Sequence, residues 1–186
     1  MSIAPTLIKS KTGYSDEWYT PQWLFDRLNA HFQFTLDPAS CKEADKGIRY
    51  ITKGENGLSV SWSNERIFCN PPFSLSKSFL AKVDEITLPS VILVPGRIET
   101  KYWFEHVWPK ANEIFVLKGR LQYFNAEGVK GSSTFPSVLL AYGGASFVGL
   151  EDLGVILKPL VSSLPKVSKE GSDSKLCNIA RENVVL

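Results

Sequence analysis

Metal ligands and disulfide partners are scarce in this sequence. Its 186 residues include only three cysteines and two histidines. Cys41, Cys69 and Cys177 are too far apart for a Cys-x-x-Cys zinc motif, and their odd number disfavours a disulfide framework. His31 and His106 lack the spacing of a metal-binding pair. We therefore expect no bound metal and a reducing compartment, the cytoplasm.

Long apolar runs and strong net charge are missing too. No stretch approaches the ~20 apolar residues of a transmembrane helix, and residues 1–11 lack the apolar segment of a signal peptide. We therefore expect no membrane partner. The formal net charge of +2 permits a nucleic-acid partner without indicating one. Nothing in the composition indicates an oligomeric state.

The hydrophobic content is 44%, which is enough to build the core of a single domain. We expect this domain at residues 15–160, after a flexible polar arm at residues 1–14. Residues 161–186 include a stretch rich in Ser, Lys and Pro. This composition predicts a linker or tail that is disordered or docks back on the domain.

Short apolar runs alternate with helical patterns over most of the chain. Helices are expected from Pro21, with Thr20 as the cap residue and the proline at the first helical position, after Ser74, and after Thr100. Strands are expected within residues 32–39, 47–52, 67–69, 91–94, 114–117, 138–142 and 155–160. Because strands that alternate with helices form βαβ units, we expect an α/β fold with a largely parallel sheet.

The segment from Arg66 to Ser74 predicts a buried strand, a stiff turn and a helix start. Two consecutive prolines fix the backbone and remove two N–H donors, and Ser74 can cap the helix. The turn therefore leaves carbonyl oxygens and the Asn70 amide at the carboxyl end of a strand, where ligands bind in open α/β sheets. A rigid structural corner without a catalytic role is the alternative.

Such a turn suits an exocyclic amino group on a planar ring. The Asn70 side-chain oxygen and the Pro71 carbonyl can accept both N–H bonds and draw the nitrogen toward tetrahedral geometry. Phe73 can stack on the ring, which is worth roughly 1–3 kcal/mol by analogy with base stacking. Catalysis would then rest on positioning and oriented dipoles rather than on an acid or base.

Two other places can contribute to a site. Asp37 follows an alternating strand pattern, so it either holds a ligand hydroxyl or ammonium group or caps a turn. Trp18 and Tyr19 precede the first helix, where they form a hydrophobic staple or line a pocket. Asn56-Gly57 by itself indicates a hairpin turn.

The turn looks like the (Asn/Asp/Ser)-Pro-Pro-(Tyr/Phe/Trp) motif of amino methyltransferases that use S-adenosylmethionine. Together with other segments, it makes the chain resemble the phage-type DNA N-6-adenine-methyltransferase (Dam) family over residues 15–142. The matching segments are Asp16-Glu17-Trp18-Tyr19-Thr20-Pro21, Leu36-Asp37-Pro38-Ala39, Asn56-Gly57-Leu58 with Trp62, Phe68-Cys69-Asn70-Pro71-Pro72-Phe73-Ser74, Val94-Pro95-Gly96-Arg97, Lys118-Gly119-Arg120-Leu121 with Phe124, and Phe135-Pro136-Ser137.

The resemblance implies a class I methyltransferase (Rossmann-like) fold, with a mostly parallel sheet of about seven strands, one antiparallel strand, and helices on both faces. It also implies S-adenosylmethionine as the methyl donor and adenine N6 in DNA as the acceptor, in a site-specific reaction. The cofactor residues would be Trp18, Thr20, Pro21, Asp37, Pro38, Ala39, Asn56 and Leu58, and the catalytic motif Asn70, Pro71, Pro72 and Phe73.

The chain departs from the family pattern at the cofactor motif. Asp37-Pro38-Ala39 is not followed by the Gly-rich turn that many methyltransferases use, which leaves open how the methionine end is held. Asn56 stands where related chains are often acidic, and Phe73 replaces the commoner Tyr. We also expect no large target-recognition domain within these 186 residues, so specificity would come from loops such as residues 121–136.

Four basic residues are candidates for contacts with DNA phosphates, although ordinary solvated charges are the alternative: Arg97, Lys101, Lys118 and Arg120. The target base would have to leave the duplex to reach Asn70. Other acceptors are RNA adenine, cytosine N4 or a protein glutamine. An idle module that binds nucleic acid or cofactor, for example in anti-restriction, is a further possibility.

Overall fold

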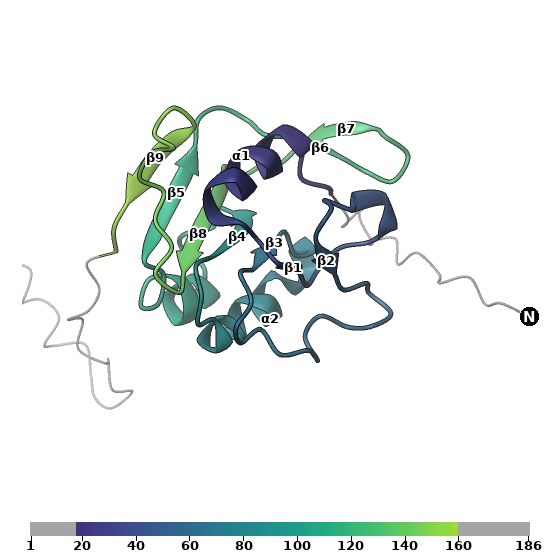
Figure 1. Ribbon diagram of the computed structural model, residues 1–186. Coiled ribbons are helices and arrows are strands. Elements are labelled where there is room, and N and C mark those ends of the chain that lie inside the picture. Colours follow the sequence, from purple (N-terminus) through teal and green to yellow (C-terminus); the bar gives the residue numbers. More distant parts are fainter. Residues whose placement is uncertain (1–17, 160–186) are drawn as a thin grey trace, which may run out of the picture.

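The computed structural model describes residues 18–159, and a five-stranded mixed sheet is at its centre (Figure 1). The spatial order is β3 (Phe68–Cys69), β4 (Ser90–Pro95), β8 (Ser137–Tyr142), β5 (Glu113–Leu117) and β9 (Gly154–Leu157). Within this sheet, β3 and β4 pair in parallel, and the other three pairings are antiparallel. The proposed arm at 1–14 and tail at 161–186 lie outside the described residues.

The predicted seven-stranded, mostly parallel sheet with helices on both faces is therefore wrong. The main sheet has five strands, and β8 lies between β4 and β5, antiparallel to both. The physical reason is that an apolar run reports burial and not direction. Every residue of β4 and of β8 is buried, so the two runs look alike in the sequence although they point in opposite directions.

Two small sheets accompany the main one. β1 (Leu36–Asp37) and β2 (Arg49–Tyr50) pair in parallel, and a single bridge between Leu36 and Ile67 places β1 beside the start of β3. β6 (Gln122–Phe124) and β7 (Lys130–Ser132) form an antiparallel hairpin. Since β1 and β3 run in the same direction, Asp37, the last residue of β1, and Asn70, directly after β3, lie at the same edge.

Within the described residues there are two α-helices, α1 (Gln22–Phe32) and α2 (Ser76–Ala81). Short 3-10 turns η1 (Lys42–Ala44), η2 (Phe73–Leu75) and η3 (Val83–Glu85) and a π-helical turn η4 (Trp103–Val107) complete the helical elements. None of these helices is long and apolar enough to cross a membrane.

The first helix begins one residue later than the sequence predicted. Pro21, and not Thr20, occupies the N-cap position, and no side chain caps the helix. The second helical segment begins earlier than predicted, as the 3-10 turn Phe73–Leu75 with Pro72 at its N-cap, and α2 follows with Leu75 at its N-cap. The prediction that Ser74 caps this helix is therefore wrong. Thr20 is therefore left with a hydroxyl that the helix does not use.

The core consists of two clusters, one on each face of the main sheet. In one, α1 packs on the sheet through Leu24, Phe25, Leu28 and Phe32, which contact alternate strand residues such as Phe68, Val91, Phe115 and Leu139. The other cluster lies on the opposite face, where α2 and η4 pack against the strand residues that alternate with those of the first cluster. Its members include Phe79, Leu80, Trp103, Ile67, Ile92 and Leu140. This packing holds β3 rigid from both sides, and hence the turn that follows it.

Candidate active site

The Asn-Pro-Pro-Phe turn is present at the end of β3. Phe68 and Cys69 are buried in the sheet, and Asn70 comes half-exposed directly after them. Pro72 is extended (φ −51°, ψ 138°), and its carbonyl accepts a hydrogen bond of 2.9 Å from the Leu75 N–H. The prolines thus carry the chain from strand to 3-10 turn with the Asn70 amide at the corner.

The amide of Asn70 is held by a main-chain group of the N-terminal segment. Its Nδ2 donates a 2.6 Å hydrogen bond to the carbonyl oxygen of Trp18. A carbonyl oxygen can only accept, so the NH2 of the amide must face Trp18. The Oδ1 atom therefore points the opposite way, and the orientation of the amide is determined by its partner.

Asp37 lies beside this turn, at the end of β1. Only 5% of the residue is exposed, and its Oδ1 accepts a 3.0 Å hydrogen bond from the Ala39 N–H. Burial raises the pKa of the Asp37 carboxyl to about 7, although the Ala39 N–H, the Lys46 charge and Ser40 act in the opposite direction. The carboxyl can thus change its charge state near neutral pH.

A small cavity joins these groups. Its volume is about 20 Å³, which is room for about one water molecule. It is lined by Trp18, Tyr19, Thr20, Asp37, Ala39, Ser40, Ala44, Lys46, Phe68 and Asn70. The fold therefore brings four of the predicted cofactor residues to the same cavity as the predicted catalytic asparagine.

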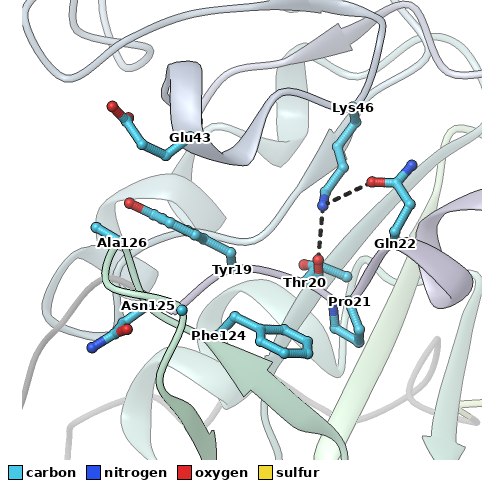
Figure 2. A pocket seen from close by; sticks show the side chains of 10 residues that line it. Tyr19, Thr20, Pro21, Gln22, Glu43, Lys46, Phe124, Asn125 and Ala126 are labelled. Atoms are coloured by element: carbon cyan, nitrogen blue, oxygen red, sulfur yellow. Dashed lines mark hydrogen bonds between the residues drawn. The ribbon is translucent and has the colours of Figure 1, made fainter.

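Lys46 was not predicted as a site residue, and no sequence signal distinguishes it from the other charges of residues 42–46. Its Nζ donates to the Thr20 carbonyl at 2.8 Å and to Gln22 Oε1 at 3.2 Å (Figure 2). Burial lowers the pKa of Lys46, while nearby carboxylates, Asp37 first among them, raise it. A half-buried cation therefore stands on the wall of the site.

A larger cavity of about 380 Å³ adjoins the first, and its size is in the range of small-molecule pockets. The N-terminal segment, Lys46 and the hairpin surround it in Figure 2. Its lining residues are Tyr19, Thr20, Pro21, Gln22, Glu43, Lys46, Phe124, Asn125, Ala126 and Gly128. Three of these, Tyr19, Thr20 and Lys46, also line the small cavity, so they form a common wall.

The β6–β7 hairpin, expected only as a loop, provides the other side of this cavity. Tyr19 and Phe124 form an antiparallel bridge, with N–H···O distances of 2.7 and 3.3 Å. Gly131 lies so close to the Trp18 ring that an added Cβ would overlap it. The hairpin thus fixes the segment whose carbonyl holds Asn70.

The predicted adenosyl region is near the site but does not line it. Gly57 packs against the backbone of Pro38, where an added Cβ would overlap the Pro38 carbonyl oxygen. The Asn56 amide turns back on its own loop, accepting from the Leu58 N–H at 3.2 Å and donating to Ser59 Oγ at 2.7 Å. Asn56, Leu58 and Pro38 line neither cavity.

The four basic residues predicted to contact DNA are exposed, and none lines either cavity. Arg97 follows β4 and Lys118 follows β5, so both lie at the sheet edge that carries Asn70. The Arg97 guanidinium stands 5.1 Å from the centre of the Phe135 ring. Arg120 donates a 2.7 Å hydrogen bond to the Ser133 carbonyl at the base of the hairpin, and Lys101 lies 3.5 Å from a glutamate of its own helix turn.

One polar atom of the site lacks a partner within residues 18–159. The hydroxyl of Thr20 is buried without a hydrogen bond, and the residue is only 4% exposed. An unpaired buried hydroxyl is costly, and a bound polar ligand would satisfy it. The site therefore suits a ligand with polar groups. Over the same residues, no cluster of His, Cys, Asp and Glu could hold a metal ion.

Comparison with known proteins agrees with the chemistry of this site. The sequence model of one family, DNA N-6-adenine-methyltransferase (Dam), matches residues 8–141, well over half of the chain. No curated protein matches the sequence. The matched region includes the turn at Asn70, the Asp37 motif and the hairpin. The chain therefore belongs to the DNA N-6-adenine-methyltransferase (Dam) family.

Proposed function

We propose that the protein transfers a methyl group from S-adenosylmethionine to the N6 amino group of an adenine in DNA. The observation that carries this proposal is the single cavity shared by Asn70 and Asp37, in which the amide of Asn70 is held in one orientation. Family membership agrees with the reaction. The cofactor is the one that membership of a methyltransferase family implies, and the residue roles are proposed from the geometry of the site.

The residues of the turn act on the acceptor nitrogen. Asn70 Oδ1, turned away from Trp18, accepts one N–H of the amino group, and the Pro71 carbonyl accepts the other. Accepting both hydrogens withdraws the nitrogen lone pair from the ring and directs it at the methyl group. The nitrogen–carbon bond forms as the methyl–sulfur bond breaks, S-adenosylhomocysteine leaves, and the amino group loses one proton to water. Phe73 stacks on the adenine, which must leave the duplex to reach this depth.

S-adenosylmethionine, when bound, supplies an electrophilic methyl group on a sulfonium sulfur. The N-terminal segment with Trp18, Thr20 and Pro21 and the Asp37-Pro38-Ala39 segment would hold it. The Asp37 carboxylate suits a ligand ammonium group, and the Thr20 hydroxyl needs a polar partner. Asn56 and Leu58 would take part only if the loop around Gly57 rearranges, because their side chains line neither cavity.

The test is Asn70→Ala with two readouts. Transfer of labelled methyl groups to DNA should be abolished, while binding of S-adenosylhomocysteine in calorimetry should survive. Asn112→Ala, an exposed amide that precedes β5 and so lies at the opposite edge, serves as the matched control. Near-normal turnover of Asn70→Ala would show that its assigned role is wrong.

Parallel assays on DNA, RNA and protein separate the acceptors. Label that appears only in RNA, on cytosine or on protein would replace adenine in DNA as the substrate. Expression in a host without DNA methylation, followed by long-read mapping of modified bases, gives the methylated base and its sequence context. If no acceptor is labelled and the cofactor does not bind, the chain is a catalytically idle module.

A further inference from the structure

We propose that Lys46 and Thr20 form the subsite for the α-carboxylate of S-adenosylmethionine, while Asp37 receives the α-ammonium group. This inference rests on the proposed function and names how the methionine end of the cofactor is held. The sequence left that question open, because no Gly-rich turn follows Asp37-Pro38-Ala39. The Ala39 N–H, the backbone donor of this motif, already bonds Asp37. Side-chain donors on the cavity wall are therefore the candidates for the carboxylate.

Lys46 can donate a hydrogen bond to the carboxylate. An ammonium group carries three N–H bonds, and two of them go to the Thr20 carbonyl and to Gln22 Oε1. These two acceptors hold the Nζ atom on the common wall of the two cavities. Because two N–H bonds of the ammonium group have fixed partners, the direction of the third is fixed as well. A positively charged donor with a fixed direction can bind a carboxylate.

Thr20 supplies the second donor from the same place. Its carbonyl accepts from Lys46, so its hydroxyl lies on the residue that Lys46 already contacts. That hydroxyl is buried and has no partner in the described part of the chain. Because Pro21 and not Thr20 caps α1, the helix makes no use of it. A ligand carboxylate would satisfy it.

The charges of Asp37 and Lys46 match those of the amino-acid end of the cofactor. Asp37 and Lys46 carry opposite charges, interact with each other, and line the same small cavity. An α-amino acid group is a zwitterion with the same two charges. The small cavity holds only about one water, so the carboxylate would sit where the larger cavity adjoins it, at Thr20 and Lys46, with the ammonium group directed toward Asp37. A DNA phosphate carries only negative charge, so it would offer Asp37 no positively charged group.

The experiment compares two ligands that differ only in the carboxylate. S-adenosylhomocysteine and its decarboxylated analogue are titrated by calorimetry into the full chain and into Lys46→Met. We expect the variant to lose about 10- to 100-fold in affinity for S-adenosylhomocysteine, as for a hydrogen bond to a charged group, and to bind the analogue as the wild type does. Lys46→Arg should restore part of the loss, and Thr20→Val should show a smaller loss of the same kind.

Lys42→Met, an exposed lysine of η1, is the matched control and should bind both ligands normally. If Lys46→Met weakens both ligands equally, Lys46 only supports the segment around Thr20, and the inference is overturned. The inference is also overturned if Lys46→Met prefers S-adenosylhomocysteine over the decarboxylated analogue as strongly as the wild type does, whether or not its DNA binding is weaker. If the wild type binds neither ligand, the proposed cofactor itself is refuted, which is a separate and recognisable failure.

Discussion

Replacing Asn70 by aspartate tests whether the Trp18 carbonyl determines the catalytic geometry. In the wild type, the amide NH2 donates to that carbonyl at 2.6 Å. In Asn70→Asp, an ionised carboxylate would bring a second acceptor oxygen to the same place, so the hydrogen bond is lost and two oxygens repel each other. Leaving such a group unpaired costs about 1–3 kcal/mol, so we expect turnover at pH 8 to fall about 10- to 100-fold.

The same geometry predicts how this loss depends on pH. The new carboxyl group would lie next to buried Asp37 and opposite a carbonyl oxygen, and both raise its pKa above the usual value of about 3.9. Once protonated, its O–H can donate to Trp18 as the amide does, and its C=O faces outward. The activity of Asn70→Asp relative to wild type should therefore rise as the pH falls from 8 toward 5.5.

The assay is transfer of labelled methyl groups to DNA under single-turnover conditions, with both proteins saturated in cofactor. Normalising to wild type at each pH removes the pH effects that are common to both proteins. Calorimetry with S-adenosylhomocysteine checks that the variant still binds ligand. A variant as active as wild type at pH 8, or a ratio that does not change with pH, would refute the role given to Trp18.

Three further predictions concern other parts of the site. Because burial raises the pKa of Asp37 from 3.8 to about 7, the stability that the group contributes is full below about pH 4 and is lost as the pH rises through 7. Asp37→Asn should thus have a higher free energy of unfolding than wild type at pH 8, by up to about 4 kcal/mol, and the difference should be smaller at pH 5. Urea unfolding at both pH values measures it, and an equal difference at the two would contradict this. Gly57→Ala should lose about 1–3 kcal/mol, since its Cβ overlaps the Pro38 carbonyl, whereas Gly54→Ala, whose Cβ would have 3.9 Å to its nearest neighbour, should be close to neutral. Equal melting temperatures for these two variants would argue against the packing. Phe73→Ala should lower kcat/KM for DNA about 10- to 100-fold with little change in cofactor binding, and an equal loss of both would show that Phe73 has a structural role.

Some of the site could be predicted from local sequence. The turn at Asn70 follows from two consecutive prolines after a buried strand, because prolines restrict the backbone without help from the rest of the fold. The first helix follows from the spacing of Leu24, Phe25, Leu28 and Phe32, all of which are buried. Such features depend on residues close together in the chain, which is why a single sequence reveals them.

Other parts of the site could not be predicted in this way. Lys46 looks like any other charge of its polar segment, and its role arises only where residues 20 and 22 approach it. The β6–β7 hairpin is short, polar at its tip, and tied to Tyr19 from the other end of the domain. Asn56 was expected at the cofactor, but its amide completes its own turn, a local bond that competes with a ligand.

The sequence by itself determined the chemistry of the turn: an amide, a carbonyl and an aromatic ring at the end of a buried strand. The tertiary structure alone decided the direction of the strands, since burial is the same for a parallel and an antiparallel neighbour. It also decided which way the Asn70 amide faces, because its partner is the carbonyl of a residue 52 positions away. Contacts between distant segments are selected by the packing of the whole domain, and no local pattern of residues encodes them.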